Sequence, residues 1–166
     1  MQRSPMFSSL IQSTALAGML FVLVLSVCQP KSLLAAQEGL TDDEKETLQQ
    51  AKDPEQQLKV WLGIADSRLK DVILHTRKLD RANSAKAVSD YRAVVTSAED
   101  CVAKEQGGKN YKKLLTQLHK AVKKYNFVLL QALDKAAEDF RQYIQSAFEA
   151  SQRVQDAAEI QMAHFK

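Results

Sequence analysis

The sequence predicts an all-α protein: an up-and-down helical bundle with a long C-terminal helix, preceded by a signal peptide. Apolar residues recur at spacings of three and four through most of residues 54–163, and strand-like alternation is absent. Strong helix breakers are rare, because residues 37–166 contain only one proline and four glycines. These residues are enough for one domain with a sizeable core. The expected helices lie at about 42–51, 54–80, 84–105 and 110–163.

Residues 1–36 are predicted to be a signal peptide. Arg3 supplies a positive start, and the apolar run at 15–27 is shorter than the roughly 20 residues that a membrane-spanning helix needs. Small residues precede a cleavage point after Ala36. We therefore expect export, either to the periplasm of a bacterial envelope or out of the cell.

Two alternatives to cleavage stay open. Leu25-Ser26-Val27-Cys28 resembles a bacterial lipobox, in which the cysteine carries a lipid anchor, although Val27 stands where that motif prefers Gly, Ala or Ser. The second alternative is an uncleaved membrane anchor, which the short apolar run disfavours. Lipidation at Cys28 would change the protein from a free exported one to an anchored one.

Two start signals predict the first helices. Thr41 and Glu44 form a capping-box pattern, and the acids after Thr41 suit the positive end of a helix. Asp53 can accept hydrogen bonds from free backbone N–H groups, and Pro54 has no N–H to leave unpaired at the first helical position. The apolar face of the helix that starts at Pro54 comprises Leu58, Trp61, Leu62, Ala65, Leu69, Val72, Thr76 and Leu79.

A turn is predicted after Leu79, because the direction of the apolar face shifts by roughly 60° between Leu79 and Val88 at 100° per residue. Asn83 or Ser84 would cap the next helix. The alternative is one unbroken helix over residues 54–105. In either case the helix ends before two adjacent glycines, which act as a terminator and hinge. The apolar face of the predicted helix comprises Val88, Tyr91, Val94, Val95, Ala98, Cys101 and Val102.

The last segment, 110–163, contains neither proline nor glycine and is predicted to be one amphipathic helix, with a kink near Asp134 left open. Residues 127–133 are apolar almost all round, which places the centre of the bundle there. A 54-residue helix would be about 80 Å long, whereas its neighbours would reach only ~33–40 Å. Its neighbours therefore cannot cover the whole helix.

Two outcomes would resolve this mismatch. The segment bends near Asp134 and folds back, or its second half protrudes and exposes an apolar stripe that seeks a partner. The second outcome predicts a homodimer or another protein partner on the C-terminal helix. The predicted association stripe comprises Phe140, Tyr143, Ile144, Phe148 and Val154.

A cationic sector is predicted on the first half of this segment. No acid occurs between Glu105 and Asp134, and six lysines cluster within roughly 120° of helix surface, opposite the leucines. The sector is either a solvated face or a binding surface for anions such as lipid headgroups, lipopolysaccharide or acidic polymers. Nucleic acid is disfavoured because Tyr111 and Tyr125 point with the leucines. The six lysines are Lys109, Lys112, Lys113, Lys120, Lys123 and Lys124.

No residue set predicts catalysis, a metal site or a cofactor site. Asp71 and His75, four apart on one helix, make half a metal site at most, and we interpret them as a surface pair. Cys101 lies on an apolar face without a nearby histidine and is interpreted as a buried structural thiol. The adjacent glycines lack the spacing of a phosphate loop. The sequence therefore favours a non-enzymatic protein.

Two segments resemble secreted bacterial all-helical proteins of unknown function, in which a helix begun by Asp-Pro-Glu leads into a helical hairpin and a long last helix. The resemblance implies the fold and export, and it transfers no functional residue. The matching residues are Asp53-Pro54-Glu55, Leu58, Ala65-Asp66, Arg68-Leu69, Leu133, Ala136, Ile144, Ala147 and Glu149-Ala150-Ser151.

The leading hypothesis from the sequence is an exported, non-enzymatic helical bundle that acts through protein contacts or self-association along the association stripe. The alternative is an envelope-associated protein that binds anionic surfaces or polymers through the lysine sector.

Overall fold

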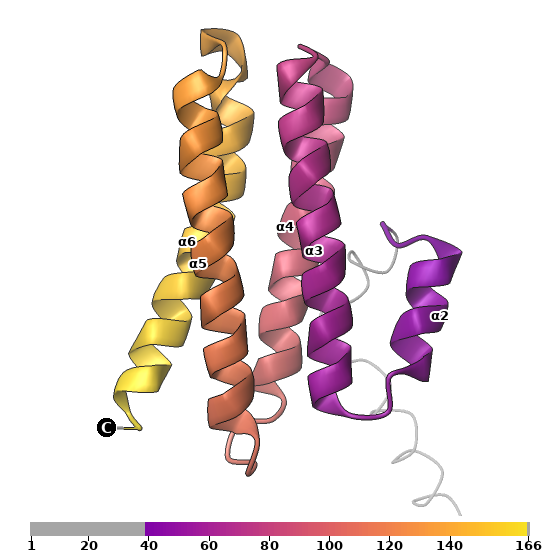
Figure 1. Cartoon of the computed structure of the whole chain (residues 1–166), viewed down its shortest axis with the longest axis vertical. Coiled ribbons are helices and arrows are strands. Elements are labelled where there is room, and N and C mark those ends of the chain that lie inside the picture. The colour runs from indigo at the N-terminus through magenta and orange to yellow at the C-terminus, as the bar shows by residue number, and fades with distance from the viewer. Residues whose placement is uncertain (1–38, 166) are drawn as a thin grey trace, which may run out of the picture. The chain divides into compact units, whose positions relative to one another are not determined.

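The computed structural model describes residues 39–165, which form five helices and no strand (Figure 1). The predicted signal peptide, the cleavage point after Ala36 and the lipid-anchor alternative at Cys28 lie outside the described residues. The helices are α2 (Asp42–Gln50), α3 (Pro54–Arg77), α4 (Arg81–Ala103), α5 (Tyr111–Lys135) and α6 (Glu138–Ala163).

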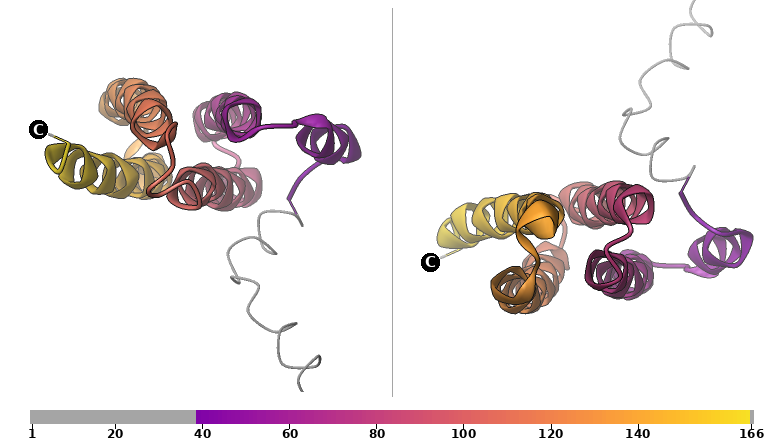
Figure 2. Two further views of the ribbon diagram at one scale, coloured as in Figure 1. Left: turned by 90° about the horizontal axis from the view of Figure 1, so that it is seen from below. Right: turned by 90° about the horizontal axis from the view of Figure 1, so that it is seen from above.

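Helices α3 to α6 form a four-helix bundle in which successive helices run in opposite directions (Figure 1). The hairpin of α3 and α4 packs against the hairpin of α5 and α6, with α4 beside α6 and α3 beside α5 (Figure 2). Short connections between antiparallel neighbours are the usual way to build such a bundle. The all-helical bundle expected from the sequence is thus confirmed.

Both predicted start signals are present. The backbone N–H of Glu44 donates to Thr41 Oγ1 at 3.2 Å, and Glu44 Oε2 accepts from the Thr41 N–H at 2.8 Å, which completes the capping box of α2. At the start of α3, Asp53 Oδ1 accepts from the Gln56 N–H at 2.8 Å, and Pro54 occupies the first helical position.

The predicted turn between α3 and α4 is confirmed, and the alternative of one unbroken helix is wrong. The capping residue, however, is Asp80 instead of Asn83 or Ser84, because its Oδ1 accepts from the Asn83 N–H at 3.1 Å. Leu79 has a φ of 57°, and the Asp80 N–H donates back to His75 O at 3.1 Å. This is the hydrogen-bond pattern of a Schellman motif, with leucine in the left-handed position that glycine usually fills.

The single helix predicted over 110–163 is corrected to two, and the alternative of a bend near Asp134 after which the chain folds back is confirmed. α5 ends at Lys135 and α6 begins at Glu138, because Ala136 and Ala137 are extended, with ψ of 139° and 145°. The chain reverses there, so α6 lies against α5 and α4 and buries its own apolar stripe. Charge supports the break, since Lys135 lies in the last turn of α5 and acids occupy the first turn of α6.

The hydrophobic core runs between the four helices, and Tyr91 and Tyr125 meet in it edge to face with ring centroids 6.4 Å apart. Residues 127–133 are not its centre, which corrects the prediction. Leu129 is fully buried, but Phe127 is 62% exposed and Leu130 is 46% exposed. The largest fully buried side chains include Tyr91, Leu58, Leu114, Leu118, Leu129 and Ile144.

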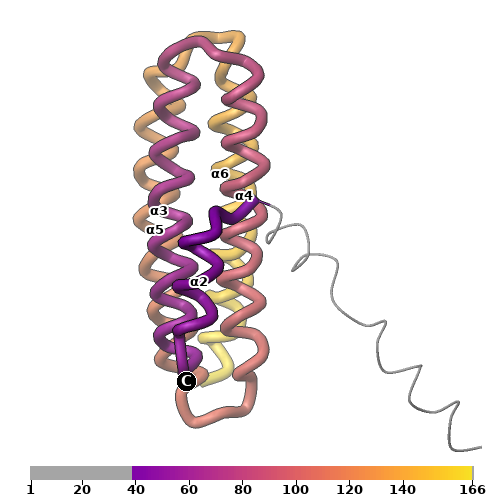
Figure 3. The backbone as a smooth tube through the Cα atoms, turned by 90° about the vertical axis from the view of Figure 1, so that its right-hand side faces the viewer, coloured from indigo at the N-terminus to yellow at the C-terminus, as the bar shows by residue number. Residues whose placement is uncertain are grey.

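Helix α2 lies on the outside of the α3–α4 hairpin (Figure 3). None of its residues is fully buried, so apolar burial holds it only weakly. A polar clamp adds to this: Arg68 Nη2 lies 2.7 Å from Glu44 Oε2 and donates to Gly39 O at 3.3 Å. We therefore describe α2 as an outer helix attached to the bundle at its N-terminal end.

Candidate functional site

The outward surface of α5 carries the predicted cationic sector. All six lysines are exposed, whereas the leucines on the opposite side of the helix are buried in the core. Lys109 lies in the loop before α5 and the other five lie on the helix. Five side chains of this sector thus project from one helix into solvent, as the helical spacing predicts, and Lys109 is exposed on the loop that precedes it.

An exposed aromatic ring lies within the same sector. Phe127 follows Lys123 by four residues and Lys124 by three, so it shares their face of the helix. Its side chain is 62% exposed, and Leu130, three residues later, is 46% exposed. We call the surface made by the six lysines with Phe127 and Leu130 the α5 face; Asp134 lies beyond Leu130 at its C-terminal end.

Glu55 on α3 lies beside the α5 face between two lysines. Its Oε2 is 2.5 Å from Lys113 Nζ and its Oε1 is 3.2 Å from Lys59 Nζ. The hydrogen bond from Lys113, followed by the one from Lys59, lowers the pKa of Glu55 to about 2. The carboxylate is therefore ionised at neutral pH, and two lysines share its single negative charge.

Asp66 repeats this arrangement further along α3. Its Oδ2 lies 2.7 Å from Lys70 Nζ, and its Oδ1 lies 3.5 Å from Lys124 Nζ. The hydrogen bond from Lys70 and the charge of Lys124 hold the pKa of Asp66 below its usual value, against the opposing effect of partial burial. The two α3 carboxylates thus neutralise only part of the positive charge around the α5 face.

The predicted association stripe does not protrude, because three of its five side chains are buried and two are partly buried, so the second of the two outcomes expected from the sequence is wrong. Phe140 is 5% exposed, Ile144 is 1% exposed and Val154 is fully buried, while Tyr143 and Phe148 pack against the core. The physical reason is the reversal between α5 and α6, which covers these side chains with the protein's own helices. They offer no exposed apolar stripe for a partner.

Asp71 and His75 border a polar hollow of about 310 Å³ that Arg68 and Asp90 also line. Arg68 Nη1 lies 4.0 Å from Asp71 Oδ2, and His75 Nδ1 is buried without a hydrogen-bond partner among the described residues. Within residues 39–165, no group of three or more His, Cys, Asp or Glu side chains is placed to hold a metal ion.

Cys101 is buried, and its thiol donates to Pro54 O at 3.9 Å. Burial raises its pKa, so the reactive thiolate is scarce at neutral pH.

His119 has a partner that local spacing did not reveal, because its Nε2 lies 2.9 Å from Glu159 Oε1 on α6. This contact joins α5 to α6 at the edge of the α5 face and leaves the histidine as a bridging residue.

No family model, curated protein or solved structure matches this chain. In the stretch that the structure describes, none of the helices combines the length and the apolar character needed to span a bilayer. The function is therefore inferred from the α5 face.

Proposed function

We propose that this protein is an exported, non-enzymatic helical bundle of the cell envelope that binds anionic lipid surfaces through the α5 face. The observation that carries the proposal is Phe127, an aromatic ring 62% exposed one turn beyond Lys123 and Lys124 on the same face of the helix. Among the sequence hypotheses, this one is favoured over self-association along α6, since the stripe that self-association requires is buried.

The charge of the α5 face suits a negatively charged surface. Its six lysines, together with Lys59 and Lys70 of α3, outnumber the carboxylates beside them among the described residues: Glu55 and Asp66, which pair with lysines, and Glu159, which lies within electrostatic range of Lys123. Each lysine close to an anionic membrane contributes on the order of 1 kcal/mol of attraction, which salt screens. Several such contributions would hold the bundle at a membrane with the α5 face toward the lipid.

The apolar side chains favour lipid over an acidic polymer. An aromatic ring and a leucine that follow a row of lysines match the side chains that bury into the boundary between headgroups and acyl chains. Phe127 and Leu130 point away from the core, so their insertion leaves the buried leucines of α5 in place. The bundle therefore needs no unfolding to bind. An acidic polymer would use the lysines but not the ring.

Vesicle co-sedimentation of the full chain tests this proposal. We expect binding to phosphatidylglycerol-containing vesicles that falls steeply with salt, and much weaker binding to phosphatidylcholine vesicles. The apolar run at residues 15–27 is common to all variants, so differences between variants report on the α5 face. Replacing Lys113, Lys120 and Lys124 with alanine should weaken binding by about 3 kcal/mol, roughly a hundredfold.

The matched control replaces Lys52, Lys78 and Lys86, which are exposed lysines outside the α5 face, and changes the net charge by the same amount. Equal losses in the two triple variants would contradict a specific face. Phe127→Ala should weaken vesicle binding and keep its salt dependence. If Phe127→Ala has no effect and polyglutamate competes fully, the surface is a polyanion site and the lipid proposal fails.

A further inference from the structure

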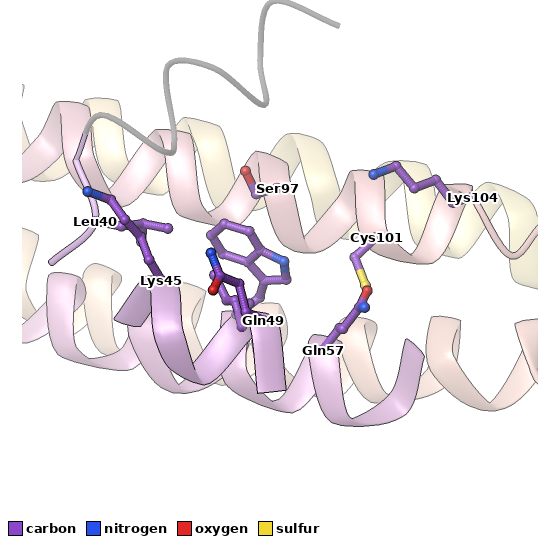
Figure 4. A pocket seen from close by; sticks show the side chains of 9 residues that line it. Leu40, Lys45, Gln49, Gln57, Ser97, Cys101 and Lys104 are labelled. Carbon is purple, nitrogen blue, oxygen red and sulfur yellow. The ribbon is translucent and has the colours of Figure 1, made fainter. Parts of the chain in front are cut away.

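A cavity of about 360 Å³ lies between α2 and the α3–α4 hairpin, on different helices from the α5 face (Figure 4). Ligand pockets for small molecules occupy roughly 300–1,000 Å³, so this cavity falls at the small end of that range. Its apolar wall comes from three separate parts of the chain: Leu40 and Leu48 from the α2 region, Trp61 from α3 and Cys101 from α4.

A buried polar atom lines this apolar wall. Ser97 on α4 is 3% exposed, and its Oγ has no hydrogen-bond partner among the described residues. Buried hydroxyl groups in folded proteins nearly always have a partner, because an unsatisfied one loses its hydrogen bonds to water. Ser97 and Trp61 both line the cavity. An acceptor atom of a bound molecule would satisfy the hydroxyl.

The charge at the cavity selects an anion. Lys45 and Lys104 line it together with two glutamine side chains, and none of the lining residues carries a carboxylate. Lys45 also pairs with Asp42 at 3.2 Å, so Lys104 is the cation left to pair with a ligand. Ser97, Cys101 and Lys104 follow one another at four and three residues along α4, so they lie on one face of the helix. In Figure 4 the Lys104 side chain reaches back along α4 over Cys101, which brings its positive charge to the cavity wall. An anionic group between Ser97 and Lys104 would meet a hydroxyl donor and an ammonium.

We propose that this cavity binds a small aliphatic carboxylate. The carboxylate accepts a hydrogen bond from the Ser97 hydroxyl and pairs with the Lys104 ammonium, while the apolar chain lies against Trp61, Leu40 and Leu48. Helix α2 forms one wall and has no fully buried residue, so it can shift at low cost to admit the ligand. This site goes beyond the proposed membrane contact and is independent of it.

The chain supplies its own reporter, because Trp61 is its only tryptophan and lines the cavity. We expect titration of the full chain with decanoate to give a saturable change in tryptophan fluorescence, and decanol, which lacks the charge, to bind more weakly. Lys104→Ala and Ser97→Ala should each weaken decanoate binding by about tenfold. Lys52→Ala, an exposed lysine outside the cavity, serves as the matched control and should leave it unchanged.

Ser97→Ala gives a second readout that does not depend on the ligand. Removing an unsatisfied buried hydroxyl should leave the ligand-free protein as stable as before or more stable, even though decanoate binds less well. The proposal is overturned if decanoate below its micelle concentration gives no saturable change, or if both variants bind like the unmodified chain. The triple lysine variant of the α5 face should bind decanoate normally, so this test and the vesicle test can fail separately.

Discussion

Tyr91 on α4 and Ser151 on α6 share a hydrogen bond in the middle of the bundle, where both residues are fully buried. The bond links the two hairpins, since Tyr91 belongs to the first and Ser151 to the second. Burial raises the pKa of Tyr91, so the phenol stays neutral under all ordinary conditions. The Tyr125 hydroxyl, which donates to Leu62 O at 2.8 Å, is a second polar contact between the hairpins. Such buried polar contacts help to set how the hairpins dock.

A double-mutant cycle on this pair should show strong coupling. Tyr91→Phe and Ser151→Ala each leave one buried hydroxyl without its partner, which should lower the free energy of unfolding by about 1–3 kcal/mol. The double variant should lose clearly less than the sum of the two single losses, because no unsatisfied group remains. Urea denaturation of the four proteins measures the coupling. Additive losses would show that the hydrogen bond contributes nothing of its own.

Leu79 and Leu74 should respond in opposite directions to glycine. Leu79 has a φ of 57° and is 58% exposed, so Leu79→Gly removes about 1–2 kcal/mol of left-handed strain. We expect a net gain of about 0.5–1 kcal/mol, because glycine also adds entropy to the unfolded chain. Leu74 is 45% exposed within α3, where Leu74→Gly should cost about 1 kcal/mol or more. Thermal unfolding of both variants checks the two signs, and a loss at Leu79 would contradict the strain.

The helix starts show how much of the fold can be predicted from the sequence. The caps at Thr41 and Asp53 were correctly predicted, because their side chains act on backbone groups only three residues away. The position of the turn at Leu79 was correctly predicted, but its capping residue was not, since leucine gives no sign that it will adopt a positive φ. The reversal at Ala136 and Ala137 has no local breaker, so packing of α6 against α5 and α4 decides it.

The candidate site, like the fold, could be predicted from the sequence only in part. Five of the six lysines were correctly expected on the side of the helix opposite the leucines, because a single helix fixes that relationship, whereas Lys109 lies in the loop before α5. Phe127 was wrongly placed in the core, since a run that is apolar all round does not show which side faces the neighbouring helices. The partners of Lys113 and Lys124 lie on α3, and the acid beside His119 lies on α6. Such contacts depend on tertiary packing, which local spacing does not reveal.

Ile144 and Ile160 provide a matched test of the corrected α6. Ile144 is 1% exposed and Ile160 is 65% exposed, although both belong to the same helix. Ile144→Ala should lower the free energy of unfolding by about 2–5 kcal/mol, through lost burial and the cavity left behind. Ile160→Ala should change it by less than about 0.5 kcal/mol. Urea denaturation, with light scattering at several concentrations, separates a loss of stability from a loss of association. If Ile144→Ala lowers the molecular mass in solution without lowering the free energy of unfolding, then Ile144 lies in an interface between copies and the protruding stripe is correct after all.

The low pKa of Glu55 predicts a specific contribution to stability in acid. Its pKa is about 2 in the folded protein and near 4.5 when unperturbed, so the unfolded chain binds the proton first as pH falls. The stabilisation by Lys113 and Lys59 is therefore complete above about pH 4.5 and is lost progressively as pH falls toward 2. Glu55→Gln should flatten the stability curve in this window, more than Glu149→Gln, whose carboxylate accepts from Gln145.

An NMR titration of the Glu55 carboxyl carbon measures the pKa directly, and Lys113→Ala should raise it. A midpoint near 4.5 in the unmodified protein would show that the ion pairs do not hold in solution.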